Sequence, residues 1–133
     1  MTKLATAKIL LVDDDRVNQM IGSRLLEELG VRVELASDGS EAMLKLSQSR
    51  FDLIFMDLEM PTLSGFETVK KLRNELKCAT PVVALTANTN QDTEEKCRAA
   101  HFNGYLSKPY DRDAIGKTLE RFLHPNQLLQ KTV

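Results

Sequence analysis

The sequence predicts an α/β fold with a five-stranded parallel sheet and helices on both of its faces. Five short apolar runs recur along the 133 residues, and each is followed by a segment with apolar side chains at helical spacing. Most of the runs are rich in leucine and β-branched residues with little polar alternation, which is typical of parallel strands covered on both faces. Strands and helices that alternate in this way form right-handed crossovers around one sheet.

The expected strands are short. They cover residues 8–12, 31–36, 51–56, 81–85 and 104–107. A helix is expected after the first strand, and it should stop at Gly30 because glycine often follows the last helical turn. The apolar positions of this first helix are Val17, Met20, Ile21, Leu25 and Leu29.

The other helices are expected from caps and apolar stripes. Asp38 and Glu41 resemble a capping box that opens a second helix, which extends through Ser47. The third helix is expected from Phe66, Val69, Leu72 and Leu76. A fourth helix over residues 90–102 is mostly polar and has few apolar anchors. The last helix is expected from Ile115, Leu119 and Phe122, and it should end before Pro125.

Composition limits the function classes. The 18 basic and 19 acidic residues leave a net charge of -1, so no generic nucleic-acid or anionic-membrane footprint is expected. No apolar run approaches the length of a membrane span, and a cytoplasmic location is expected. Cys78 and Cys97 are expected in helices as free structural thiols, while His101 and His124 are isolated and offer no metal cluster.

The chain is expected to form a single domain over residues 1–133. Its folded core should cover about 8–123, with loose flanks at 1–7 and 124–133.

Polar residues follow four of the five expected strands. Ligands of open parallel sheets bind outside the carboxyl ends of the strands, so these positions are the candidate site. The residues found there are Asp13, Asp14 and Asp15 after the first strand, Asp57 after the third, Thr86 after the fourth and Lys108 after the fifth.

Three carboxylates in one small cleft resist ionising together, and a hard divalent cation with oxygen ligands relieves that repulsion. Magnesium is the expected ion, with manganese as an alternative. A carboxylate, a metal, an ammonium and a hydroxyl around one pocket suit phosphoryl transfer, with Asp57 as the nucleophile.

The motifs resemble those of a known family. The acidic pair in "DDDRVNQMI", the central aspartate in "MDLEMPTLSGFE", the Thr-Ala of "ALTAN" and the Lys-Pro of "LSKPY" resemble the receiver domains of two-component response regulators. The first two motifs resemble in particular the receivers of hybrid sensor histidine kinases. The resemblance extends from Lys8 to Leu123.

The resemblance implies a flavodoxin-like doubly wound fold with strand order 2-1-3-4-5. It also implies that Asp57 accepts a phosphoryl group from a phosphohistidine of a sensor histidine kinase or a phosphotransfer protein. Magnesium would be bound directly by Asp14, Asp57 and the backbone carbonyl of Glu59, and by Asp13 through water.

By the same resemblance, Lys108 pairs with the phosphoryl oxygens, and Thr86 and Tyr105 switch conformation. Glu59 and Asn88 occupy positions that tune dephosphorylation, and the peptide bond before Pro109 is cis. The domain would catalyse its own phosphorylation and dephosphorylation and would not be an enzyme that acts on other substrates, although a full-length protein could include a histidine kinase. No direct contact with nucleic acid or membrane is implied, and a weak homodimer stays open.

Other interpretations of the same residues stay open. Asp15 fits a helix N-cap better than a metal ligand, and Asp13 and Asp14 could be favourable charges at a helix N-terminus. Thr86 could be a helix cap, Lys108 an ordinary exposed lysine and Tyr105 a half-buried packing residue.

Two rival functions also remain. A haloacid-dehalogenase-type phosphatase would use Asp13 as nucleophile and Asp15 as acid/base, but it leaves Asp57 without a role. An interaction module with the same fold and no phosphorylation is the third possibility, although all the chemical groups are present.

Overall fold

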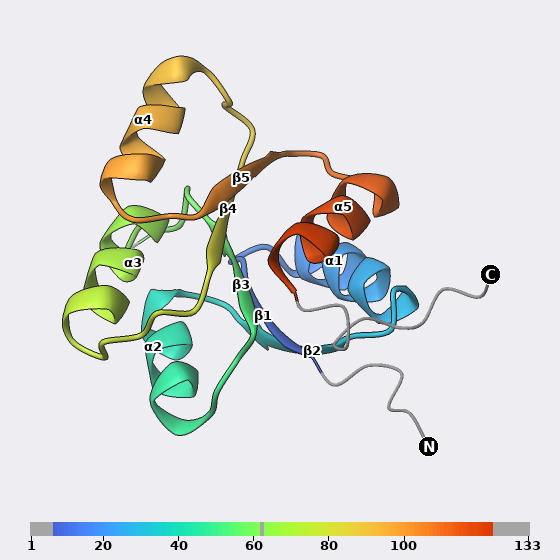
Figure 1. The fold of residues 1–133 in the computed structure, drawn as a ribbon, viewed down its shortest axis with the longest axis horizontal. Coiled ribbons are helices and arrows are strands. Elements are labelled where there is room, and N and C mark those ends of the chain that lie inside the picture. The colour runs from blue at the N-terminus through green and yellow to red at the C-terminus, as the bar shows by residue number, and fades with distance from the viewer. Residues whose placement is uncertain (1–6, 62, 124–133) are drawn as a thin grey trace.

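The computed structural model describes residues 7–61 and 63–123, which form one parallel sheet with helices on both faces (Figure 1). The strand order is β2-β1-β3-β4-β5, so the predicted fold class and strand order are confirmed. The strands are β1 (Lys8–Val12), β2 (Arg32–Ala36), β3 (Leu53–Asp57), β4 (Val82–Thr86) and β5 (Gly104–Ser107). The helices are α1 (Arg16–Glu28), α2 (Gly39–Gln48), α3 (Gly65–Asn74), α4 (Gln91–Ala99) and α5 (Arg112–Phe122).

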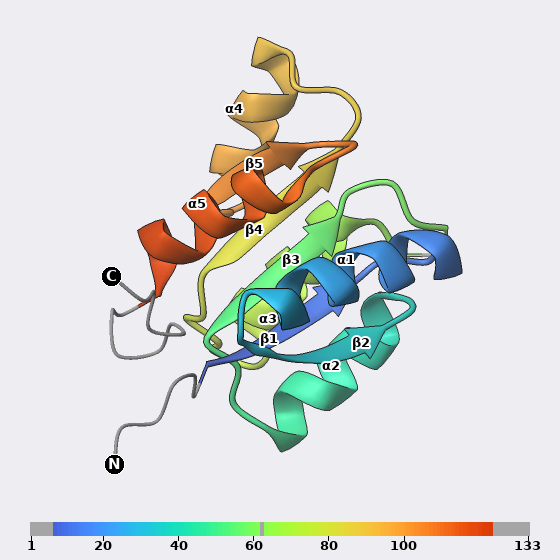
Figure 2. The same cartoon turned by 90° about the vertical axis from the view of Figure 1, so that its right-hand side faces the viewer.

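The sheet separates two apolar layers. Helices α1 and α5 cover one face, and α2, α3 and α4 cover the other (Figures 1 and 2). Alternate residues of a strand supply opposite layers, so Ile9 and Leu11 pack with Leu26 of α1 and Ile115 of α5, whereas Leu10 packs on the other side. The central strands are buried on both faces, as their continuous apolar runs predict.

The predicted strand ends differ from the observed ends at two important positions. Asp57 and Thr86 are the last residues of β3 and β4, whereas the sequence placed them just after the strands. Both therefore belong to the ladder and are held by a neighbouring strand, with Asp57 opposite Leu85 and Thr86 opposite Ser107. A side chain at such a position has a better defined direction than one in a loop.

The first helix is confirmed, but its predicted apolar face was wrong for three of the five residues, whereas Leu29 packs against the core as predicted. Val17, Met20 and Ile21 are at least half exposed, at 61%, 69% and 50%. The buried residues of α1 are instead Gln19, Gly22 and Leu26. Gln19 can be buried because its amide donates hydrogen bonds to the carbonyl of Asp13 and the hydroxyl of Ser37. A polar residue therefore lies on the buried face of α1, where the apolar spacing predicted an apolar residue.

The helix caps agree in part with the predictions. Asp15 is the N-cap of α1 and accepts hydrogen bonds from the backbone N–H groups of Val17 and Asn18 at 2.8 and 3.3 Å. Asp38 caps α2, but the Glu41 carboxylate accepts from Ser37 and not from the cap residue, so the predicted box is incomplete.

A complete capping box lies at the start of α3, where the sequence analysis had not placed one. Ser64 accepts from the backbone of Glu67, and the Glu67 side chain accepts in return from the backbone of Ser64.

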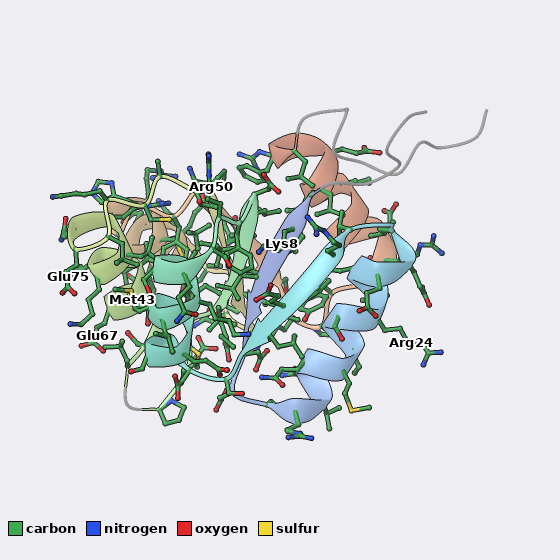
Figure 3. The ribbon with its side chains drawn as sticks, turned by 90° about the horizontal axis from the view of Figure 1, so that it is seen from below. Lys8, Arg24, Met43, Arg50, Glu67 and Glu75 are labelled. Carbon is green, nitrogen blue, oxygen red and sulfur yellow. The ribbon has the colours of Figure 1, made fainter. Side chains whose placement is uncertain are left out.

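Arg73 connects the segments that precede β4 and β5, at the end of the sheet opposite the candidate site. Its guanidinium donates hydrogen bonds to the carbonyls of Cys78, Thr80 and His101 and to the side chain of Asn103, all between 2.7 and 2.9 Å. In contrast, Arg24 and Glu75 point away from the sheet on the outer sides of their segments (Figure 3).

Both cysteines are free, as predicted, but Cys78 lies after α3 and not within a helix. Ala7 falls within the predicted loose N-terminal flank, but this prediction is wrong for it, because Ala7 is buried and its carbonyl accepts from the backbone N–H of Arg32. The rest of both predicted flanks, with His124 and Pro125, lies outside the described residues. Among the described helices none is long and apolar enough to cross a membrane.

Candidate functional site

The residues predicted for the site meet at the carboxyl edge of the sheet. Asp13 follows β1, Asp57 ends β3, Thr86 ends β4 and Lys108 follows β5. Because parallel strands point the same way, their ends deliver these side chains to one cleft.

Three carboxylates gather in this cleft. One oxygen from each of Asp13, Asp14 and Asp57 can be chosen so that all three lie within 4.8 Å of one another. Asp13 and Asp57 are 0% and 2% exposed, whereas Asp14 is exposed. The cluster thus consists of two buried carboxylates, Asp13 and Asp57, and one exposed carboxylate, Asp14, at the entrance of the cleft.

Backbone and side-chain hydrogen bonds fix the β1–α1 turn that carries these aspartates. Asp13 accepts from the backbone N–H of Asp15 at 3.0 Å, and Asp15 in turn caps α1. The amide of Gln19 donates to the backbone carbonyl of Asp13 at 2.6 Å and to the hydroxyl of Ser37 at 3.1 Å. The triple aspartate therefore contains one cap residue and two residues held toward the cleft.

Lys108 provides the positive charge of the cleft. Its ammonium lies 3.1 Å from Asp57 Oδ1 and 3.5 Å from Asp13 Oδ2. The backbone N–H of Lys108 donates to the carbonyl of Thr86 at 2.8 Å, and the peptide bond between Lys108 and Pro109 is cis, as the resemblance implied. Burial alone would lower the pKa of Lys108, but its contacts with Asp57 and Asp13 outweigh this effect and raise the pKa.

Burial dominates the electrostatics of Asp57. It raises the pKa of this carboxyl from the ordinary 3.8 to about 6, even though the hydrogen bond and charge of Lys108 act in the opposite direction. The neighbouring charge of Asp13 raises the pKa further, while a hydrogen bond from the backbone N–H of Glu59 at 3.2 Å lowers it. Asp57 is therefore a carboxylate whose charge is costly to keep without a further cation.

The hydroxyl of Thr86 points toward Glu59 and the loop that follows β4. It donates to Glu59 Oε2 at 3.2 Å, with the carbonyl of Asn88 as a second acceptor at 3.3 Å, and it accepts from the backbone N–H of Asn88 at 3.0 Å. Thr86 itself is fully buried. The structure thus connects Glu59 and Asn88 through the hydroxyl of Thr86.

Tyr105 is separate from the carboxylate cluster. It lies on β5, is 37% exposed and donates a hydrogen bond from its hydroxyl to Glu94 of α4 at 2.9 Å. This contact raises the pKa of Tyr105, because the hydrogen bond to the carboxylate favours the protonated hydroxyl. Tyr105 is therefore more than a half-buried packing residue, since its hydroxyl has a defined partner.

The site fits a hard divalent cation. Asp13 Oδ2 is buried and accepts no hydrogen bond within the described residues, and its ion pair with the ammonium of Lys108 is long, at 3.5 Å. A buried carboxylate oxygen without a hydrogen-bond donor is stabilised by a metal ion or a metal-bound water. An all-oxygen set of three carboxylates suits Mg²⁺ better than a soft metal.

Sequence reasoning missed several residues that shape this cleft. The amide of Gln19 donates to the carbonyl of Asp13 and to the hydroxyl of Ser37, and a Cβ at Gly65 would collide with the carbonyl of Asp57. Tyr110 lies beside the cleft, and burial raises its pKa, with a further increase from the charge of Asp13. Of these residues only Gly65 could have been found from the sequence, because Ser-Gly precedes the third predicted helix. The positions of Gln19, Ser37 and Tyr110 at the cleft depend on how separate elements pack.

The fold and site together define a doubly wound α/β domain with an acidic, lysine-containing cleft at the carboxyl ends of its strands. Residues 9–120 match the family model described as the response regulator receiver domain. The chain belongs to this family, and it is a receiver domain of a two-component phosphorelay.

A curated relative is much longer than this chain. The osmosensing histidine protein kinase SLN1 of Saccharomyces cerevisiae is 37% identical over 123 residues, which cover 88% of this chain but only 10% of SLN1. The chain therefore spans about a tenth of that relative.

Two solved receiver structures are also similar. The receiver domain of sensor histidine kinase PA1611 from Pseudomonas aeruginosa, which has a magnesium ion coordinated in its active site cleft, is 39% identical with a TM-score of 0.80, and the match covers 89% of this chain and 98% of that one. The complex of the Saccharomyces cerevisiae phosphotransfer protein Ypd1 with the receiver domain of Ssk1 gives 30% identity and a TM-score of 0.83, covering 91% of each chain.

Proposed function

We propose that Asp57 of this receiver domain accepts a phosphoryl group from a phosphohistidine in a magnesium-dependent reaction. The observation that carries the proposal is the buried Asp57 carboxylate, which lies 3.1 Å from the ammonium of Lys108 and within 4.8 Å of carboxylate oxygens of Asp13 and Asp14. The phosphohistidine donor would belong to a sensor histidine kinase or a histidine phosphotransfer protein. A cytoplasmic location stays a prediction that agrees with this role.

The residues have separate tasks in this reaction. A carboxylate oxygen of Asp57 attacks the phosphorus atom, the P–O bond forms, the P–N bond to the donor imidazole breaks and the imidazole leaves with the electron pair of that bond. Lys108 offsets negative charge on the phosphoryl oxygens. Asp14, Asp57 and the backbone carbonyl of Glu59 would hold Mg²⁺ directly and Asp13 would hold it through water, and Mn²⁺ could replace it. The ion, when bound, supplies charge neutralisation in the cleft.

Phosphorylation would then change the conformation. The phosphoryl group adds about 1.5 to 2 negative charges and new acceptor oxygens, so the hydroxyl of Thr86 would exchange Glu59 for the phosphoryl group. Tyr105 would follow inward and alter the surface formed by α4, β5 and α5. Glu59 and Asn88, which contact Thr86 in the structure, would affect how fast the acyl phosphate hydrolyses. The domain would thus catalyse both its own phosphorylation and its own dephosphorylation.

Intact-mass analysis after incubation with acetyl phosphate and Mg²⁺ tests the proposal. The wild-type domain should gain a phosphoryl adduct, and Asp57→Asn should lose it, whereas Asp13→Asn should retain a reduced amount. An adduct that is lost in Asp13→Asn but kept in Asp57→Asn would instead support the phosphatase. A wild-type domain that never gains an adduct would support a non-phosphorylated interaction module.

The exposed side of α1 is the proposed docking surface for the phosphohistidine donor. Val17, Met20 and Ile21 lie within two turns of Asp14, which is at the entrance of the cleft. A donor must place its imidazole at Asp57 while it contacts a surface nearby, and the apolar residues of α1 offer that contact. The similar Ssk1 receiver forms a complex with a phosphotransfer protein, which supports this class of partner.

Met20→Glu should reduce the rate of phosphoryl transfer from a phosphohistidine donor protein by about 10-fold or more, because a buried interface charge is costly. Phosphorylation by acetyl phosphate should remain unchanged, since this small donor does not use the surface. Leu44→Glu is a matched control, because Leu44 is 56% exposed but lies on α2, on the opposite face of the sheet. Equal rates for Met20→Glu and Leu44→Glu would exclude α1 as the docking surface.

A further inference from the structure

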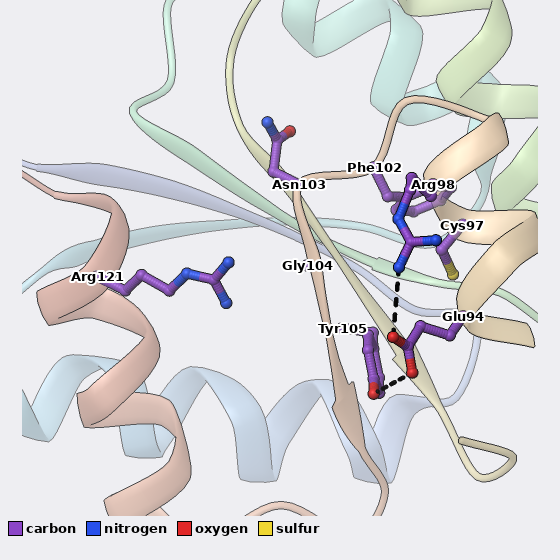
Figure 4. Close-up of a pocket in the computed structure, with 8 residues that line it drawn as sticks. All are labelled: Glu94, Cys97, Arg98, Phe102, Asn103, Gly104, Tyr105 and Arg121. Atoms are coloured by element: carbon purple, nitrogen blue, oxygen red, sulfur yellow. Dashed lines mark hydrogen bonds and ion pairs between the residues drawn. The ribbon is translucent and has the colours of Figure 1, made fainter. Parts of the chain in front are cut away.

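Glu94 of α4 contacts Tyr105 in a specific geometry. The hydroxyl of Tyr105 donates to Glu94 Oε2 at 2.9 Å, while Glu94 Oε1 lies 3.4 Å from an Arg98 guanidinium nitrogen (Figure 4). The carboxylate therefore uses one oxygen for the tyrosine and the other for an arginine one turn further along the helix. Glu94 thus contacts Arg98 and the tyrosine hydroxyl at the same time.

We propose that Glu94 is a positioning residue that holds Tyr105 on the outer side of β5 in the unphosphorylated domain, and so sets how readily the domain adopts the phosphorylated conformation. The proposal rests on the function proposed above, because it assigns a residue to the resting state of that switch. It goes beyond that function because it identifies the hydrogen bond between Tyr105 and Glu94 as the interaction that must break.

The position of Tyr105 on the sheet explains why the interaction must break. Tyr105 pairs with Ala84 of β4, and Thr86 lies two residues beyond Ala84, so Ala84 and Thr86 project to the same face of the sheet. Ala84 is fully buried, and its small side chain restricts a ring that moves toward Thr86 less than a larger one would. A Tyr105 ring that moves toward Thr86 leaves its outer position, and its hydroxyl then loses Glu94 as an acceptor.

Helix α4 is loosely anchored, which makes one polar contact important. Within α4 only Cys97 is buried, with Ala100 as the buried C-cap, and the remaining residues are exposed or intermediate. Little apolar surface therefore fixes this helix against the sheet. The hydrogen bond from Tyr105 to Glu94 connects α4 directly to β5, so the same contact influences the position of both the ring and the helix.

The contact also shapes a pocket between α4, β5 and α5. The pocket has a volume of about 580 Å³, and Glu94 and Tyr105 form part of its wall together with Arg98, Phe102 and Arg121 (Figure 4). Movement of the Tyr105 ring would remove part of this wall. Release of Glu94 would therefore change the shape of the surface on this side of the domain.

Titration with beryllofluoride and Mg²⁺, a stable phosphoryl analogue at carboxylates, tests the proposal without a kinase. Glu94→Ala should bind the analogue about five-fold more tightly than the wild-type domain, because the resting state loses a hydrogen bond that is typically worth a factor of about 2 to 12. Glu95→Ala is the matched control on the same helix, since Glu95 contacts Gln91 and has no contact with the tyrosine, and its affinity should equal that of the wild type.

A double-mutant cycle separates positioning from helix stability. Tyr105→Phe removes the donor hydroxyl, so adding Glu94→Ala to Tyr105→Phe should give no further gain in affinity. A gain of similar size in the Tyr105→Phe background would show that Glu94 acts through α4 alone and would overturn the proposal.

Tyrosine fluorescence gives a direct spectroscopic readout. The chain contains no tryptophan and two tyrosines, so Tyr110→Phe leaves Tyr105 as the only strong emitter. A hydrogen bond to a carboxylate quenches tyrosine emission, and Glu94→Ala in this background should therefore increase it before any analogue is added. Beryllofluoride should produce a smaller further change in Glu94→Ala than in its parent.

The outcomes distinguish this proposal from the proposed function. If wild type and Glu94→Ala bind beryllofluoride equally and Asp57→Asn does not bind it, the positioning role is wrong and the phosphoacceptor role stands. If the wild-type domain does not bind beryllofluoride with Mg²⁺, the proposed function and the positioning role both fail.

Discussion

Asp57→Asn should stabilise the metal-free domain at pH 7 by about 3 kcal/mol while it abolishes phosphorylation. The physical reason is the burial of Asp57, which raises the pKa of its carboxyl from 3.8 to about 6. A shift of this size corresponds to about 3 kcal/mol of penalty on the ionised folded state. The pKa of about 6 already includes the opposing effect of Lys108, and the amide retains the shape of the side chain.

The pH dependence of this stabilisation has a defined sign. The folded-state pKa of Asp57 lies above the unfolded value, so between about pH 4 and pH 6 the folded domain binds more protons than the unfolded chain. The contribution of Asp57 to stability therefore falls as the pH rises through this window and stays low above it. The advantage of Asp57→Asn should be near zero at pH 3.5 and complete above about pH 6.5.

Urea denaturation in EDTA at several pH values measures this prediction. Asp14→Asn is the matched control, because it removes a carboxylate from the same cluster at an exposed position. It should change the free energy of unfolding by less than about 0.5 kcal/mol. An advantage of Asp57→Asn that is constant from pH 3.5 to pH 7.5 would show that burial of the charge is not its cause.

The spacing of apolar residues was sufficient to predict the fold, but it did not predict which face of every helix is buried. The continuous apolar runs of β1, β3 and β4 correctly predicted central parallel strands, because residues covered on both faces leave little room for polar alternation. In α1 the apolar residues Val17, Met20 and Ile21 lie outside, since Gln19 gains hydrogen bonds below the helix. The sequence pattern shows the positions of apolar residues, but it does not show the hydrogen-bond acceptors that another segment provides for a polar residue such as Gln19.

The cleft could be predicted for the same reason that the fold could. Once parallel strands are assigned, their carboxyl ends must share one edge, and this places Asp13, Asp57 and Lys108 together without knowledge of side-chain conformations. The contact between Glu94 and Tyr105 could not be predicted in this way. It depends on the position of α4 against β5, and α4 has too few apolar anchors for the sequence to define that position.

Lys108→Met should reduce phosphorylation of the domain by acetyl phosphate by about 100-fold or more. The ammonium lies 3.1 Å from Asp57, the proposed acceptor of the phosphoryl group, and removal of one preorganised charge-stabilising group costs about that much in enzymes. In the metal-free state the same variant should lose about 2 kcal/mol of stability at pH 7. Loss of one partner from a fully buried ion pair costs about 3 to 5 kcal/mol, and the side chain of Lys108 is 20% exposed, which reduces the cost.

Magnesium should restore much of that stability but little of the phosphorylation. A cation held by the aspartates replaces the lost positive charge, and an ion at 100 times its dissociation constant stabilises the folded state by about 2.7 kcal/mol. It would not replace the lysine in its proposed contact with the phosphoryl oxygens. Denaturation and intact-mass rates, each with EDTA or Mg²⁺, separate the two effects. Lys117→Met, at a 76% exposed position on α5, should leave both unchanged, and full phosphorylation of Lys108→Met would show that the lysine only stabilises the cleft.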